Sequence, residues 1–445
     1  MPEQLEFSNL FPKTKITASF DTPEMTTDAG VLLLREVDMI SGISEKLSRA
    51  IEDKRAPGYT THSMRSLIQQ RVFQICQGYE DADDCDHFRK DVALKTAVGK
   101  HSAFPKRDLC SQPTMTRLEN SVTKRDLIRL FYAQVDLFCE SFDRTPECIV
   151  LDVDPTVSNC YGDQQLSLFN SHAGDYCLMP FHVYDGVTGG VIATVIRPGK
   201  TPTADEIIAL LKRIVKKIRQ YFPNTLLIFR ADGHHSKPKV HEWCETNWVE
   251  MVLGQPKNKA IQRVFRTALK TAEEKFKENG RPMKYYASAR YKAGTWKEYR
   301  RVVCRIIVDQ QGRIDDRYIV TSFEGTKAKY LYESVYCDRG NAELFIKEHK
   351  RGLKSDRMSC NKATANQFRL FLHSAAYTMM HTLRKNLLHG TELQKASFET
   401  IRLRLLKVAA NISVKKTRIH FHMPEHFPLK DIFYTVINRI MAVKT

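Results

Sequence analysis

The chain has 445 residues, of which 27% are charged, with 69 Lys and Arg against 51 Asp and Glu. This length predicts about three domains. The sequence has no run of eighteen apolar residues and no charged-then-apolar leader at its start, which argues against a membrane protein and predicts a cytoplasmic one. The 11 cysteines form no Cys-x2-Cys pair, so neither a zinc ribbon nor a disulfide scaffold is expected.

Positive charge is concentrated in two segments. Residues 254–305 contain 15 Lys and Arg against 4 acids, and residues 401–445 contain 9 against 2. Their net charges of +11 and +7 account for the whole +18 of the chain. Clustered cations release counterions from a phosphate backbone when they bind it. The distribution therefore predicts a nucleic-acid partner, with a solvated surface as the alternative for each segment.

The first 145 residues are predicted to form a mostly helical domain. Apolar residues recur at helical spacing in 63–84 and in 114–138, where the pattern breaks between 120 and 123. A helix-turn-helix that reads DNA and a plain packing unit both fit this pattern.

Two short apolar runs each end in aspartate. Residues 147–156 end in Asp152 and Asp154, which share one face of a strand at period two, and residues 225–235 contain Asp232. An aspartate at the end of a strand is commonly a turn former. Two such strands in one chain, followed by an acidic helix, instead indicate paired metal ligands at the carboxyl ends of a sheet.

The acidic helix is expected in residues 336–350. Its polar face carries Tyr336, Arg339, Glu343 and Lys350. At roughly 100° per residue these four side chains fall within a sector about 60° wide. One carboxylate and two cations on one face indicate contact with metal and phosphate, with a solvated stripe as the alternative. Gly340 is unfavourable inside a helix, so we expect the helix to begin near Asn341, which can cap it.

The segment between the first two acids predicts the rest of one sheet. Residues 177–198 read as a hairpin, and a helix is expected from the capping box at Thr203 to Pro223. Strand, strand, strand, helix, strand is the order of a ribonuclease H-like layer. Between Asp232 and Glu343, residues 255–330 contain alternating runs that predict a β-rich basic insertion. In it, Trp296 is either a surface on which an unpaired base stacks or a core residue.

Several of these motifs, taken in order, resemble those of the DDE transposases of bacterial insertion sequences, in the subgroup with the Tyr-x2-Arg-x3-Glu-x6-Lys signature. They are GYEDADDCDHFRKD, LCSQPTMTRLENS, LDVDPTVSNCYGDQQ, CLMPFHVYDGVTGG, VIRPGK, FRADGHH and the helix of Glu343. The resemblance covers most of residues 20–390. It implies that Asp154, Asp232 and Glu343 are the catalytic and metal-binding acids. Asp154 matches the family's Asp-x-Thr pattern, and Asp152 is kept in reserve.

The resemblance also implies a chemistry. Two Mg²⁺ ions, with Mn²⁺ as a substitute, would serve hydrolysis and strand transfer. Arg339 and Lys350 would bind phosphates near the scissile bond, while Tyr336 either positions DNA or packs beneath the helix. Trp296 would hold a flipped base, as in some relatives. Three histidines follow Asp232 closely, namely His234, His235 and His241. We expect them to hold the metal ligands in place or to be exposed, and not to bind the metal, since magnesium prefers oxygen ligands.

The expected function is that of a cut-and-paste DNA transposase, acting as a homodimer on the terminal inverted repeats of its element and on target DNA, in the cytoplasm and on the nucleoid. The alternatives are a non-catalytic DNA-binding protein derived from a transposase and a nuclease without strand transfer. The expected fold class is α/β, a ribonuclease H-like core with a β-rich insertion, preceded by a mostly helical domain. The predicted layout is 1–145 helical, 146–254 first part of the core, 255–330 insertion, 331–390 second part of the core and 391–445 basic C-terminal region.

Overall fold

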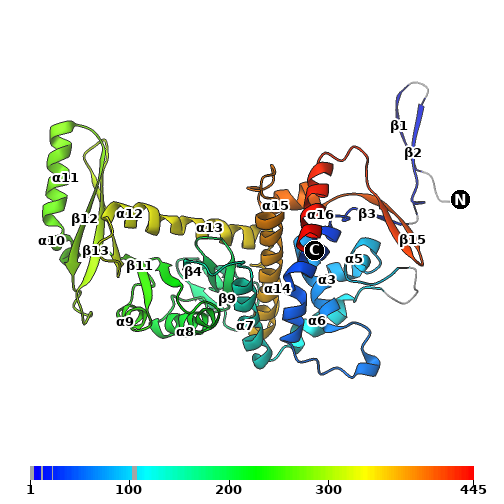
Figure 1. Cartoon of the computed structure of the whole chain (residues 1–445), viewed down its shortest axis with the longest axis horizontal. Helices are drawn as coiled ribbons and strands as arrows, with labels where there is room; N and C mark the ends of the chain where they lie inside the picture. The colour runs from blue at the N-terminus through cyan, green and yellow to red at the C-terminus, as the bar shows by residue number, and fades with distance from the viewer. Residues whose placement is uncertain (1–4, 12–13, 23, 103–107, 445) are drawn as a thin grey trace.

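The computed structural model describes residues 5–11, 14–22, 24–102 and 108–444. The molecule is elongated, with a β-sheet in its middle, a helical unit at one end and a projection of strands and helices at the other (Figure 1). Within these ranges, no helix combines the length and the apolar character needed to cross a bilayer.

Eight strands form the central sheet, in the order β12-β13-β14-β11-β10-β4-β8-β9. Their bounds are Met283–Tyr291 (β12), Arg300–Val308 (β13), Ile314–Thr321 (β14), Val249–Gln255 (β11), Leu226–Ala231 (β10), Cys148–Pro155 (β4), Phe181–Asp185 (β8) and Val191–Val195 (β9). Strands β4, β10 and β11 are parallel, and the other pairs are antiparallel. The predicted order of three strands, a helix and a strand is present as β4, β8, β9, α8 (Ala204–Tyr221) and β10.

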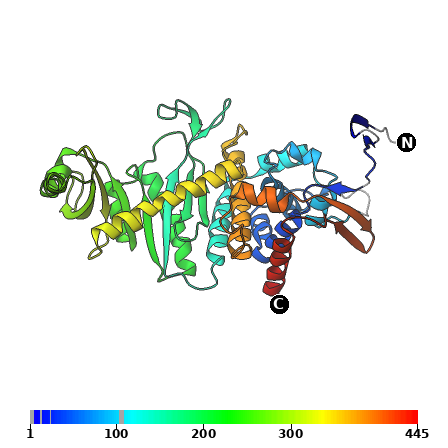
Figure 2. The same ribbon diagram turned by 90° about the horizontal axis from the view of Figure 1, so that it is seen from above.

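The two faces of the sheet have different cores. Ile149, Leu151 and Val153 of β4 belong to the large hydrophobic core that includes α8 and α9 (Pro238–Thr246). Val150 points the other way, into a smaller core with Leu331 and Tyr332. Because side chains alternate along a strand, Asp152 and Asp154 share this second face, which a long helix crosses (Figure 2).

This long helix is made of short segments joined end to end. They are α12 (Ala328–Tyr330), a π-helical turn (Leu331–Tyr336), a 3-10 turn (Cys337–Arg339), α13 (Gly340–Lys347) and a second π-helical turn (Glu348–Gly352). Gly340 has helical backbone angles, with φ −54°. The predicted start near Asn341 is therefore wrong. The packing of Leu331 and Tyr332 stabilises the preceding turns more than Gly340 weakens them.

The insertion continues the central sheet. Its strands β12 to β14 lie close to the predicted runs, and β14 pairs with the edge of β11, with Leu253 opposite Val320. Two helices that the sequence analysis did not predict, α10 (Lys259–Val264) and α11 (Arg266–Asn279), precede these strands. Ile261, Phe265 and Ala272 are buried at helical spacing, a pattern that the dense Lys and Arg of this segment obscured.

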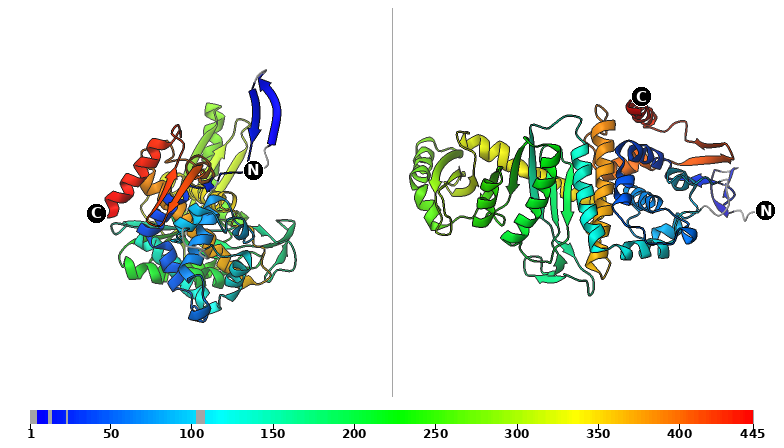
Figure 3. Two further views of the ribbon diagram at one scale, coloured as in Figure 1. Left: turned by 90° about the vertical axis from the view of Figure 1, so that its right-hand side faces the viewer. Right: turned by 60° about the horizontal axis from the view of Figure 1, so that its bottom comes forward.

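Helices dominate the first 140 residues. They are α1 (Val31–Ser41), α2 (Ile43–Arg49), α3 (Met64–Gln77), α4 (Asp84–His87), α5 (Val92–Ala97), α6 (Gln112–Ser121) and α7 (Lys124–Glu140). The predicted break between the last two is present, and Thr123 and Asp126 form a capping box there. Helix α14 (Ala363–Thr382) stands between the sheet and these helices and contacts both β9 and α3 (Figures 1 and 3).

The C-terminal region folds back onto the N-terminal helices. Strand β15 (Ala410–Lys415) pairs with β16 (Arg418–His422) and with β3 (Met25–Thr26), and α16 (Lys430–Lys444) packs on α1. The backbone N–H of Gly30 donates to the carbonyl of Leu406 at 3.2 Å. The two ends of the chain therefore form one unit.

Replacing Gly30 by alanine is expected to lower the free energy of unfolding of this unit by about 1 to 3 kcal/mol, as overpacking does. The added Cβ would lie 2.4 Å from the Cα of Leu406. Thermal unfolding measures the effect, and Gly58→Ala is the control, since its Cβ would meet no atom within 4 Å. An unchanged Tm for Gly30→Ala would contradict the close docking of the two termini.

Candidate active site

Asp152 is engaged in a buried ion pair. Its two carboxylate oxygens accept hydrogen bonds from Nε and Nη2 of Arg230, both at 2.6 Å, and its side chain is 0% exposed. Burial raises the pKa of Asp152 to about 6, although Arg230 acts to lower it. Arg230 also donates to the carbonyl of Val335 in the long helix. The pair thus ties β4 and β10 to this helix and engages both carboxylate oxygens of Asp152.

Asp154 lies at the end of β4, below the long helix. The guanidinium of Arg339 is 3.9 Å from Oδ2 of Asp154 through Nη1 and 3.5 Å from Oε1 of Glu343 through Nη2. The side chains of Asp154 and Glu343 are 23% and 65% exposed. Arg339 therefore sits between two acids that come from different elements, and Glu343 has room to turn.

The other two predicted acids act electrostatically on Asp154. Burial is the main cause that raises the pKa of Asp154 to about 7, and the negative charges of Asp232 and Glu343 raise it further. Arg339 opposes this shift. Acids from β4, from the loop after β10 and from α13 are thus brought into one region, as the sequence analysis expected.

Asp232 follows β10 directly and is oriented by the next few residues. Its Oδ1 accepts hydrogen bonds from Nδ1 of His235 at 2.8 Å and from the backbone N–H of His234 at 3.0 Å. Burial alone would raise the pKa of Asp232, but the hydrogen bond from His235 and the influence of both histidines leave it below the ordinary value. His235 is fully buried and holds the carboxylate in place, which agrees with a supporting role.

Tyr336 and Lys350 connect the long helix to the ends of two strands. The hydroxyl of Tyr336 lies so close to Gly254 in β11 that a Cβ there would be 2.7 Å from it. Nζ of Lys350 donates to Oγ1 of Thr156 at 3.3 Å and to the carbonyl of Val157. Tyr336 is therefore packed near Asp232, and Lys350 is bonded to the two residues that follow β4.

Trp296 does not lie at this site. It is 5% exposed, and its ring meets His241 and Tyr291 edge-on, with centroids 5.2 Å and 5.5 Å away, and the guanidinium of Arg300 at 5.3 Å. No face of the indole is open to a base in this conformation. The DNA-binding role expected for Trp296 is therefore not supported, because the residue fills the contact between the β12–β13 hairpin and α9, as its alternative interpretation predicted.

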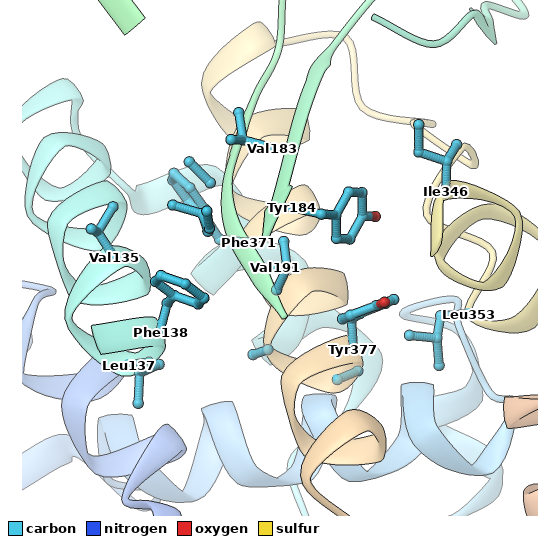
Figure 4. Packing of buried hydrophobic residues seen from close by; sticks show 14 of the residues in the cluster. Val135, Leu137, Phe138, Val183, Tyr184, Val191, Ile346, Leu353, Phe371 and Tyr377 are labelled. Carbon is cyan, nitrogen blue, oxygen red and sulfur yellow. The ribbon is translucent and has the colours of Figure 1, made fainter. Parts of the chain in front are cut away.

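A buried group that the sequence analysis missed supports the Glu343 helix from below. The hydroxyl of Tyr184 in β8 is 3.2 Å from Nδ1 of His349, which in turn is 3.2 Å from Nδ1 of His182. Tyr184 also packs against Tyr377 of α14, as Figure 4 shows. Burial lowers the pKa of His349 to about 3, so the group is uncharged. His182 and Tyr184 are two residues apart on β8, but His349 and Tyr377 lie far from them in the sequence, and no periodic signal joins the three segments.

The donor set suits a hard divalent cation. Asp154, Asp232 and Glu343 offer only carboxylate oxygens, the ligands that magnesium prefers. In the described part of the chain, no group of three acidic, histidine or cysteine side chains lies close enough to hold a metal as it stands. Arg339 occupies the space between two of the acids, so binding requires that this side chain move aside.

In the absence of divalent cations, the titration of Asp154 should make the protein less stable as pH rises. The folded-state pKa near 7 exceeds the ordinary value of 3.8, so the folded state binds the extra proton between these values and the free energy of unfolding falls across this window. Asp154→Asn should remove that slope and stabilise the protein at pH 8 by about 1 to 4 kcal/mol. Denaturant unfolding from pH 3.5 to 8 measures it, and parallel curves for the two proteins would contradict the shift.

Comparison with known proteins identifies the family. No curated protein matches the chain. Among solved structures, the chain is similar to a piggyBac transposase in a synaptic complex with hairpin DNA, with a TM-score of 0.43 and 12% identity, covering 86% of this chain and 80% of that chain. The family described as Transposase DDE domain group 1 matches residues 8–445. Because this match spans nearly the whole chain, the protein belongs to that family of DDE transposases.

Proposed function

We propose that this transposase cleaves the ends of its DNA element by metal-dependent phosphodiester hydrolysis and joins the freed 3′-hydroxyl ends to target DNA. The observation that carries the proposal is the convergence of three acids from separate elements. Burial, together with the negative charges of Asp232 and Glu343, raises the pKa of Asp154 to about 7, and carboxylates with strongly perturbed pKa values cluster at functional sites.

Asp154, Asp232 and Glu343 are the residues that would hold two Mg²⁺ ions, or Mn²⁺ in their place. When bound, such a pair activates the attacking oxygen and stabilises the leaving one. His235 keeps the carboxylate of Asp232 oriented, and Arg230 with Asp152 keeps the helix of Glu343 over the ends of the strands.

Arg339 and Lys350 are suited to bind the phosphates beside the scissile bond. Arg339 presents a planar fork to a phosphate once it leaves the two acids, and Lys350 provides a point charge. Tyr336 lies next to Gly254 and Asp232, so we assign it the packing role, with DNA contact as the alternative.

The proposed catalytic core is ribonuclease H-like. The strand order β9-β8-β4-β10-β11, with β8 antiparallel to β4, and the helix α8 between β9 and β10 support this assignment. The sites of such a core lie at the carboxyl ends of its first and fourth strands, where Asp154 and Asp232 stand.

DNA is the proposed partner, as element ends with inverted repeats and as target. The net charge of +18 supports it, since clustered cations bind a phosphate backbone in a salt-dependent way. Each chain carries one set of the three acids while an element has two ends, so we propose a homodimer in the synaptic complex. Its place of action is the cytoplasm, on the nucleoid.

Replacing Asp154, Asp232 or Glu343 by alanine should abolish magnesium-dependent cleavage of the inverted-repeat DNA, because a carboxylate ligand is lost, and leave DNA binding within a few fold of wild type. Gel analysis of end-labelled DNA and a mobility-shift titration measure the two quantities. Asp338→Ala is the matched control, since Asp338 is an exposed acid on the same helix and should retain cleavage.

The alternatives give different products. A DNA-binding protein without catalytic activity would bind the ends of the element. It would leave them uncut whichever divalent cation is added. A nuclease would release cut ends without joining them to a target plasmid. Joined products from the wild type, lost in all three alanine variants, agree with the proposal alone.

His235→Leu should weaken the binding of Mn²⁺ by about 10-fold to 100-fold, as loss of a hydrogen bond to a ligand commonly does. Titration of the DNA-free protein, followed by electron paramagnetic resonance of free Mn²⁺, measures the affinity without relying on activity. His235→Gln keeps an N–H donor and should recover part of the loss. Equal affinities of the wild type and the leucine variant would contradict the orienting role.

A further inference from the structure

A cleft with a volume of about 760 Å³ opens next to the proposed active site. The side chains that carry the argument are Tyr161, Gln164, Lys350, Arg351, Lys354 and Arg357. We call this the basic cleft. Lys350 joins it to the active site, because its Nζ bonds to Thr156 and Val157, which follow Asp154 closely in the chain. The basic cleft therefore begins at the residues that directly follow the Asp154 strand, with Val157 and Lys350 in its wall.

Positive charge in the basic cleft is only partly neutralised. Two acids, Asp81 and Asp356, also line the cleft. Arg357 pairs with Glu80 at 2.6 Å and with Asp81 at 3.6 Å, and Lys350 has Asp356 at 4.0 Å. Arg351 and Lys354 are in no ion pair with any residue that the structure describes. Two cations in one cleft without acidic partners suit an anionic ligand.

The backbone at Lys354 is held in an unfavourable conformation. Its φ of +57° lies in the left-handed region, which a residue with a side chain adopts at a cost. The turn is closed by hydrogen bonds from Ser355 N–H to the carbonyl of His349 and from Arg357 N–H to that of Lys354, both at 3.2 Å. Glycine adopts this backbone conformation at lower cost than lysine does. The presence of a lysine therefore indicates a role for its side chain.

Gln164 provides a buried acceptor without a partner. Its side chain is 7% exposed, and its Nε2 donates to the carbonyl of Met358. That bond fixes the orientation of the amide and leaves Oε1 without a hydrogen-bond partner in the described structure. The loop is held rigidly, since Gln165 N–H donates to the carbonyl of Asn361 at 2.9 Å. These two bonds fix the segment that carries Tyr161 against the loop that follows the long helix.

Tyr161 adds an aromatic surface. It is 86% exposed at the edge of the cleft, in the segment between β5 (Ser158–Asn159) and β6 (Leu168–Asn170). An exposed aromatic ring beside cations is the combination with which proteins bind single-stranded nucleic acid, because every base has a face that can stack.

We propose that the basic cleft binds one unpaired nucleotide of the DNA strand next to the scissile phosphate. Arg351 and Lys354 bind its phosphate, and Tyr161 stacks on its base. The volume is in the range of pockets that enclose a molecule of this size. This inference rests on the proposed function, since it places the nucleotide by the position of the cleavage site.

The test uses binding rather than cleavage. The full-length Asp154→Ala protein, without divalent cations, is titrated with duplexes of the element end that carry a single mismatch at each position around the cleavage site. A mismatch at the position of the proposed nucleotide should tighten binding about 10-fold, because the base is already unpaired. Tyr161→Ala should remove this gain and lower affinity for the mismatched duplex between about fivefold and 100-fold.

Tyr176→Ala is the matched control, since Tyr176 is 58% exposed on the same small sheet of β5, β6 and β7 (Asp175–Leu178) and lies outside the cleft. It should keep the gain. No gain at any position, or a gain that survives Tyr161→Ala, would overturn the inference while leaving the proposed function intact. A protein that fails to bind any end duplex would contradict the proposed function itself.

Lys354→Gly separates a role in binding from a role in folding. The variant relieves the unfavourable backbone, so its Tm should equal or exceed that of the parent protein. It should bind the mismatched duplex several-fold more weakly, with the slope of log K against log salt reduced by about one. Lys354→Arg keeps the charge and should behave like the parent. Unchanged affinity and slope for Lys354→Gly would refute the phosphate contact.

Discussion

The cost of ionising Asp154, a partly buried carboxylate near two other acids, is the constraint around which the centre of this protein is arranged. Burial raises the pKa of Asp154, and the negative charges of Asp232 and Glu343, which come from two other elements, raise it further. Nearby cations and hydrogen-bond donors stabilise the charged carboxylates. Arg339 lies between Asp154 and Glu343, and His235 donates to Asp232. One arginine thus lies near two carboxylates, and its single positive charge does not neutralise both of them.

The long helix above the sheet is the element that allows the carboxylate of Glu343 to change its orientation. Its π-helical turns flank α13 on both sides, and such turns recur at functional sites. The carbonyl of Val335, in the first of these turns, receives a hydrogen bond from Arg230, while His349, in the second, rests on Tyr184. Glu343 lies between these two anchors and remains exposed, so its carboxylate can turn without disturbing the helix.

Polar groups buried beneath this helix fix its position. The ion pair of Asp152 and Arg230 is well shielded from water, and a pair of this kind favours one geometry more than it adds stability. Gly186 makes room for it, since a Cβ there would lie 2.4 Å from Nη2 of Arg230. Trp296 likewise fixes the position of a neighbouring element, because its burial joins the insertion to α9. The pairing of β14 with β11 extends the central sheet into the insertion.

Local chemistry in the sequence determined much of the outcome. The short apolar runs of β4 and β10 placed two aspartates at strand ends, the capping residues Thr123 and Thr203 set the starts of α7 and α8, and the motifs identified the family. Contacts between distant segments decided the rest, because spacing carries no information about them. The pairing of Asp152 with Arg230, the burial of Trp296, the helix that runs on through Gly340 and the docking of β15 on β3 arise only when surfaces far apart in the chain pack together and exclude water.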